Sequence, residues 1–104
     1  MTRRTSAAEY RTRRQRRGRL EKRQQRDAEL IAYGAAVCYG EDGTGGVCGL
    51  MGGKYADALY GRYCLAHPWR GVAADMGMSQ HGVRNLIDVA LDMLDSCGVD
   101  RVRR

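Results

Sequence analysis

The stretch that decides the fold runs from residue 69 to residue 94 and reads WRGVAADMGMSQHGVRNLIDVALDML. Its second half repeats apolar residues at the spacing of one helical face, which predicts an amphipathic helix. These residues are Val83, Leu86, Ile87, Ala90, Leu91 and Leu94. Val72, Ala73 and Met76 predict a shorter helix before it. Because Gly77 suits a left-handed turn and Ser79 suits an N-cap, we expect two helices joined by a short turn.

This stretch resembles the helix-turn-helix of sigma-factor region 4 and related regulators, in the pattern A-x-x-x-G-x-S-x-x-x-V-x-x-L. Ala73 matches the small residue where the two helices cross, Gly77 the turn, and Met78, Val83 and Leu86 the buried positions. The resemblance implies DNA binding, with a set of polar residues facing the major groove. Those residues are Ser79, Gln80, His81, Arg84 and Asn85. The alternative is a pair of ordinary packed helices whose polar face is solvated.

The second predicted helix departs from that pattern in two ways. Gly82 lies inside it, at a cost of about 1 kcal/mol relative to alanine. Asp88, Asp92 and Asp95 make its far half acidic, and carboxylates repel phosphates. We therefore expect only the first two turns to enter a groove, while the acidic half is free for a protein partner or for the arginine-rich segment of another copy.

The positive charge of the chain is concentrated at its N-terminus. The net charge is +6, but residues 1–26 hold ten Arg and one Lys against two acidic residues, a surplus of nine. Residues 27–104 hold seven basic and ten acidic residues, a deficit of three. Arginine binds phosphate bidentately and stacks on bases, so nucleic acid is the expected partner of this arm. The arginines expected to contact nucleic acid are Arg11, Arg13, Arg14, Arg16, Arg17 and Arg19.

Local signals predict that the arm is helical. Ser6 and Glu9 have the spacing of a capping box, and helix-forming residues continue to about Tyr33. The segment from Gly34 to Gly61 then holds nine glycines, which exclude a long helix. We expect turns and short strands there, with strand edges at residues 47–48 and 63–64 and a possible short helix over residues 54–60.

Three cysteines and a histidine in and after this glycine-rich segment suggest a metal site. Cys38, Cys48, Cys64 and His67 follow the spacing C-x9-C-x15-C-x2-H, and thiolate with imidazole favours a closed, structural Zn²⁺ site. The alternative is a set of free thiols in a small core, with His67 hydrogen-bonded. The remaining Cys97 is expected to be a core residue.

The combination of these parts also resembles known regulators. Cys48-Gly49 followed by Tyr63, Cys64 and His67 is similar to the zinc module of GcrA-type regulators and of small phage-encoded regulators. Phage antiterminators of the Q type share the architecture of a zinc finger with a sigma-like helix-turn-helix. The resemblance implies a DNA-binding transcription regulator that also contacts RNA polymerase, and a phage is one expected source of it.

The sequence therefore predicts a mainly α chain with four parts. These are an arm or helix over residues 1–33, a zinc-binding module over 34–67, a helix-turn-helix over 68–97 and a basic tail over 98–104. No stretch approaches the ~18 consecutive apolar residues of a membrane span, and no secretory signal is visible, so we expect a cytoplasmic, nucleoid-associated protein of a bacterial or phage-infected cell. The oligomeric state is left open.

Two other functions compete with transcription regulation by duplex DNA binding. An RNA-binding or ribosome-associated zinc protein would use the arm and treat the C-terminal helices as a platform. A polymerase-binding adaptor or inhibitor would use the acidic helix. We do not expect an enzyme, because a chain of 104 residues leaves little room for a deep pocket, and His81 has no partner group for catalysis.

Overall fold

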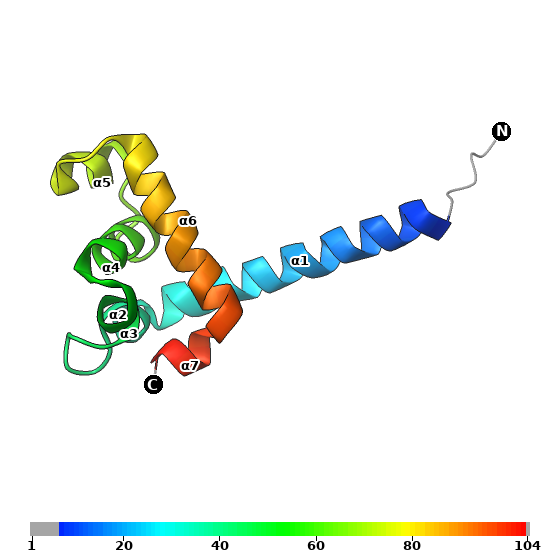
Figure 1. The fold of residues 1–104 in the computed structure, drawn as a ribbon, viewed down its shortest axis with the longest axis horizontal. Helices are drawn as coiled ribbons and strands as arrows, with labels where there is room; N and C mark the ends of the chain where they lie inside the picture. Colours follow the sequence, from blue (N-terminus) through cyan, green and yellow to red (C-terminus); the bar gives the residue numbers. More distant parts are fainter. Residues whose placement is uncertain (1–6, 104) are drawn as a thin grey trace.

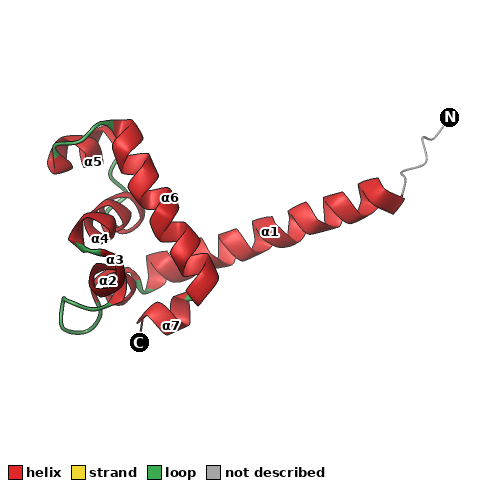
Figure 2. Ribbon diagram, in the orientation of Figure 1, coloured by secondary structure: helices red, strands yellow, loops and turns green. Residues whose placement is uncertain are grey.

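The computed structural model describes the backbone of residues 7–103 and the side chains of residues 18–103, and this part of the chain is mainly helical. The helices are α1 (Ala7–Ala32), α2 (Gly34–Tyr39), α3 (Gly46–Met51), α4 (Gly53–Leu59), α5 (Trp69–Met76), α6 (Gln80–Cys97) and α7 (Val99–Arg103). A π-helical turn, η1 (Tyr60–Cys64), follows α4 directly. Figure 2 shows helices joined by short loops, and no strand occurs in residues 7–103.

The predicted arm helix is confirmed over Ala7–Ala32, whereas its expected cap, Ser6, lies outside the described residues. Figure 1 shows that α1 projects from the body near the C-terminal end of α6, while α5 lies at the other end of α6. Leu30, in the last turns of α1, is fully buried, and Leu20 is 56 % exposed. The C-terminal end of α1 therefore belongs to the core, and the preceding turns extend beyond it.

The core forms beneath α6, which packs against α4 and α5. Val83, Ile87, Ala90 and Leu94 of α6 are all buried, as the predicted periodicity requires. Leu59 and Val47 meet them from the glycine-rich segment. Burying an aliphatic side chain contributes about 1.5 to 3 kcal/mol, so this one core connects the glycine-rich segment to the C-terminal helices.

The strands expected at residues 47–48 and 63–64 are wrong, because these residues lie in α3 and η1. The glycines interrupt helices instead of joining strands. Gly46 has φ 58°, and an added Cβ would lie 2.2 Å from the carbonyl oxygen of Val37, so this tight entry to α3 requires glycine. The short helix expected over residues 54–60 is present as α4, Gly53–Leu59.

The predicted basic tail also forms a helix, α7, that packs back on the body. Val99 and Val102 are 7 % and 5 % exposed. The guanidinium carbon of Arg103 lies 4.1 Å from the ring centroid of Tyr33, which follows α1 directly. The end of the described chain thus helps to fix the point where α1 leaves the body. Among residues 7–103, no helix combines the length and the apolar character that crossing a bilayer requires.

Candidate nucleic-acid interface

The turn between α5 and α6 has the geometry that its residues predict. Gly77 is left-handed, with φ 65° and ψ 34°. Its N–H donates to Ala74 O at 3.2 Å, and the N–H of Met78 donates to Ala73 O at 2.9 Å. These two bonds satisfy the last carbonyl groups of α5 in the manner of a Schellman motif. The turn therefore ends α5 with its backbone groups paired and fixes where α6 begins.

Ser79 caps the start of α6. Its Oγ accepts a hydrogen bond from the N–H of Gly82 at 3.0 Å. A Cβ at Gly82 would lie 3.1 Å from Met78 Cε and 3.2 Å from Ser79 Oγ. The glycine that weakens the predicted helix thus leaves room for the capping hydroxyl and for Met78 beside it.

The side chains expected to meet DNA all lie at the exposed N-terminal end of α6. Ser79, Gln80, His81, Arg84 and Asn85 are exposed. Val83 and Ile87, on the opposite face, are 0 % and 1 % exposed. The structure therefore brings the five predicted residues together on one accessible polar surface, held by a buried face beneath it.

A cluster of two arginines and one tryptophan extends this surface. The guanidinium carbons of Arg62 and Arg84 each lie 4.7 Å from the ring centroid of Trp69, within cation–π range. Arg62 also donates from Nη1 to the carbonyl oxygen of His67 at 3.1 Å. Neither arginine forms an ion pair with a carboxylate among the side chains of residues 18–103. We call Arg62, Trp69 and Arg84 the tryptophan cluster.

Sequence reasoning singled out Arg84 and missed Arg62 and Trp69. The three residues come from η1, α5 and α6 and lie far apart in the sequence, so the spacing within one helix cannot connect them. The signal that could have identified them is the type of residue. Trp69 is the one tryptophan of the chain, and a tryptophan beside arginines is typical of surfaces that stack on bases or hold phosphates.

The arginines of the arm are placed in part. Arg19 is exposed on α1, whereas the side chains of Arg11, Arg13, Arg14, Arg16 and Arg17 lie outside the described residues. A hollow of about 390 Å³ lies between α1 and the end of α6, and its lining includes Arg19, Lys22, Arg23 and Arg26. Sequence reasoning did not single out the last three, although the charge of the arm includes them.

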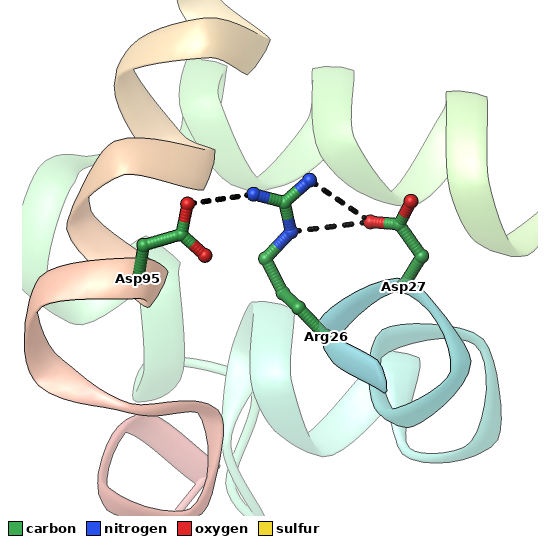
Figure 3. A network of polar contacts seen from close by, with 3 residues as sticks. All are labelled: Arg26, Asp27 and Asp95. Carbon is green, nitrogen blue, oxygen red and sulfur yellow. Dashed lines mark hydrogen bonds and ion pairs between the residues drawn. The ribbon is translucent and has the colours of Figure 1, made fainter. Parts of the chain in front are cut away.

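Among the basic residues that line this hollow, Arg26 is held by two carboxylates. Its Nη1 donates to Asp95 Oδ2 of α6 at 2.7 Å, and its Nε donates to Asp27 Oδ1 at 3.1 Å. Figure 3 shows the guanidinium group between the two carboxylates. Burial lowers the pKa of Arg26, but the two carboxylates outweigh this effect and raise the pKa overall. Arg26 thus fastens α1 to the C-terminal end of α6.

The four residues expected to bind zinc do not converge in this conformation. Cys38 is fully buried. The Cys64 Sγ lies 3.7 Å from the carbonyl oxygen of Leu30. His67 is turned elsewhere, with its Nδ1 3.8 Å from Asp75 Oδ2. Among the described residues, no three His, Cys, Asp or Glu side chains lie close enough to hold a metal ion, so zinc stays a prediction.

The two thiols differ in burial, because Cys38 lies in the core and Cys64 is half-buried against α2. Burial, with the neighbouring Cys64, raises the pKa of Cys38 to about 12, and burial also raises the pKa of Cys64. A Cβ at Gly34 would lie 2.1 Å from Cys64 Sγ, so α2 packs directly on this thiol. The expectation that Cys97 is a core residue is wrong. It is exposed at the last residue of α6, beyond the buried Leu94.

No family model, no curated protein and no solved structure matches the chain.

Proposed function

We propose that the chain is a sequence-specific duplex-DNA-binding regulator of transcription in which the first two turns of α6 enter the major groove. The observation that carries the proposal is the exposed polar end of α6 beside the tryptophan cluster, where two guanidinium groups have no carboxylate partner among the described residues. Arginine without such a partner is available to guanine or to phosphate.

Each part of this surface has a distinct role in the proposal. Arg84 and Asn85 read base edges, since arginine pairs bidentately with guanine and asparagine with adenine. Arg62 and Trp69 lie beside the groove and contact the phosphate backbone, which positions the protein without reading sequence. The arginine-rich arm neutralises further phosphates and supplies most of the salt-dependent affinity.

The second half of α6 takes another role. Asp88 and Asp92 are exposed, and these carboxylates repel a duplex. We assign this face to a protein partner, which in the regulators that the motif resembles is RNA polymerase. Because this assignment rests on charge and exposure, it is secondary to the groove assignment.

The test is selection from a pool of random duplexes and a matched RNA pool, at two salt concentrations, with zinc-loaded and metal-free protein. We expect enrichment of a defined duplex motif. Arg84→Ala is expected to reduce the discrimination between selected and random duplexes by about 1 to 3 kcal/mol. Arg101→Ala is the matched control, because it removes the same charge from an exposed position on α7 and should leave the discrimination unchanged.

Trp69 supplies a second readout, because it is the one tryptophan of the chain and Arg84 stacks on it. When Arg84 leaves the indole ring for a base edge, the emission of Trp69 is expected to change, and Arg84→Ala should abolish most of that change. Binding that favours RNA without sequence preference, or equal discrimination by Arg84→Ala and wild type, contradicts the proposal.

A further inference from the structure

A second site lies where α2, α4, η1 and α5 meet. It is a pocket of about 250 Å³ whose lining includes Tyr39, Asp57, Tyr60, His67, Val72 and Asp75. This volume equals that of roughly eight water molecules at about 30 Å³ each. The pocket therefore has room for a four-atom guanidinium group with part of its methylene stem. We call it the tyrosine pocket.

Two tyrosines form one wall of the tyrosine pocket. The ring centroids of Tyr39 and Tyr60 lie 5.5 Å apart at an interplanar angle of 65°, an edge-to-face pair. The Tyr39 hydroxyl donates to Asp57 Oδ1 at 2.5 Å. Burial and this contact raise the pKa of Tyr39, so the phenol stays a donor. The rings offer negatively polarised faces, and Asp57 adds a full negative charge beside them.

The rest of the lining supplies a second carboxylate and an apolar floor. Asp75 of α5 is 71 % exposed in its side chain and has His67 Nδ1 at 3.8 Å. Gly61 and Val72 close the floor, with the Val72 methyl groups packed over Gly61. No lysine or arginine among the described residues lines the pocket. Two carboxylates, aromatic faces and an apolar floor suit an organic cation with an apolar stem, which is the chemistry of an arginine side chain.

The arginine that follows the pocket-lining Gly61 in the same chain is already engaged. Arg62, the next residue after the floor glycine, binds the His67 carbonyl group and stacks on Trp69. α1 runs away from the body, so its N-terminal end points away from α2, α4 and α5 (Figure 1). The arm of the same chain is therefore poorly placed to reach the tyrosine pocket.

We propose that the tyrosine pocket binds an arginine side chain from the arm of a second copy of this chain. Charge complementarity supports this occupant. Residues 1–17 hold seven arginines and a single acidic residue, whereas residues 27–104 carry a net charge of −3. Because the arm of one copy and the pocket of another are different surfaces, the contact is head-to-tail and propagates unless two copies exchange arms.

The experiment is sedimentation of the full-length protein without nucleic acid, at about 0.01 M and about 0.15 M salt, where the Debye length is about 30 Å and about 8 Å. The pocket variant is Asp57→Asn with Asp75→Asn, in which asparagine still accepts the Tyr39 hydrogen bond. The control is Glu41→Gln with Asp100→Asn, which removes the same charge from exposed positions outside the pocket. The arm variant replaces Arg13, Arg14, Arg16 and Arg17 with Gln. Circular dichroism and thermal unfolding establish that each variant is folded.

We expect the wild-type protein to self-associate at the lower salt concentration and to dissociate at the higher one. The pocket variant and the arm variant should each weaken the association by about tenfold or more, and the control should resemble wild type. Asp75→Asn alone, at an exposed side chain, should show part of the effect if the double variant fails to fold. A wild-type monomer at low salt overturns the proposal, as does equal association of pocket and control variants. If association persists in the arm variant, the assigned occupant is wrong.

Discussion

The two ends of α6 hold arginine in opposite ways. At the N-terminal end, Arg84 and Arg62 stack on Trp69 and form no ion pair with a described side chain. At the C-terminal end, Arg26 is 11 % exposed in its side chain and lies between Asp27 and Asp95. The helix of 18 residues separates these ends by about 27 Å, so each end has its own electrostatic surroundings.

This difference shows that the presence of arginine does not by itself identify a binding surface. Carboxylates already neutralise the charge of Arg26, and its contacts with α6 set the direction of α1. The charge of Arg84 is stabilised by an aromatic face, which a base edge or a phosphate can replace at little cost. The proposed recognition surface therefore lies at the N-terminal end of α6, and the arm is attached at the C-terminal end.

The largest loss of stability is expected from a substitution in the core that both ends of α6 share. Ile87 is 1 % exposed in the middle of α6, so Ile87→Ala should lower the free energy of unfolding by about 2 to 5 kcal/mol. The exposed Val89 is the control on the same helix, and Val89→Ala should change the free energy of unfolding by about 0.5 kcal/mol or less. Urea denaturation measures both. Equal effects of the two substitutions would show that α6 does not pack as described.

Alkaline pH tests the body without changing the charge of the arginines at either end of α6, because arginine stays protonated. The buried Cys38 has its pKa raised from 9.0 to about 12. An acid whose pKa is higher in the folded than in the unfolded state favours folding while it is protonated. This stabilisation is complete below the unfolded-state pKa and is lost as the pH rises toward the folded-state pKa. The free energy of unfolding should thus begin to fall above about pH 9, by on the order of 1 kcal/mol for this thiol at about pH 10.

The control for this pH dependence is Cys38→Ala, compared with wild type by urea denaturation at about pH 8 and about pH 10. The variant should lose less stability than wild type over this interval. An equal loss in both proteins would place the Cys38 thiol in contact with solvent, in conflict with its complete burial.

A smaller loss of stability is expected when only the N-terminal end of α6 is changed. Ser79→Ala removes the hydroxyl that accepts from the Gly82 N–H and should cost about 1 kcal/mol of stability. Ser79→Asp restores an acceptor at the cap and should recover most of the loss. Thermal unfolding measures both variants. Stability of Ser79→Ala equal to that of wild type would show that the cap does not hold the first turn of α6.

The smallest effect is expected at the C-terminal end. Arg26→Gln removes the contacts with Asp27 and Asp95, but Asp95 is 46 % exposed and remains hydrated, so the loss of stability should be about 1 kcal/mol or less. The preference among duplex sequences should not change. A loss of sequence preference in Arg26→Gln would contradict the division of roles between the two ends of α6.

The sequence was most informative where a helix is long enough to repeat its pattern. Val83, Ile87, Ala90 and Leu94 mark the buried face of α6 over several turns, and the left-handed Gly77 follows from the usual chemistry of helix ends. The stacking of Arg62 and Arg84 on Trp69 could not be predicted in this way, because it joins three elements that the chain order does not place side by side.

The glycine-rich segment was harder to predict, since none of its helices exceeds two turns. α2 and α3 have six residues each, too few to establish a period, and glycine is compatible with turns between strands as well as with helix ends. Tertiary packing decides between helix and strand in this segment, because it buries Val37, Val47 and Leu59 in one core. The cysteine spacing likewise predicts a set of four zinc ligands, and this stays a prediction, since His67 Nδ1 lies 3.8 Å from Asp75 Oδ2 in this conformation.

The most direct test of the groove assignment replaces each guanine of the selected duplex in turn with 7-deazaguanine, which lacks the N7 acceptor in the major groove. Affinities are measured for wild type, Arg84→Ala and Arg101→Ala. We predict one guanine at which the replacement weakens wild type and Arg101→Ala by about tenfold, while Arg84→Ala loses nothing further there. If Arg84→Ala loses as much as wild type at every guanine, Arg84 does not read a base and the assignment fails.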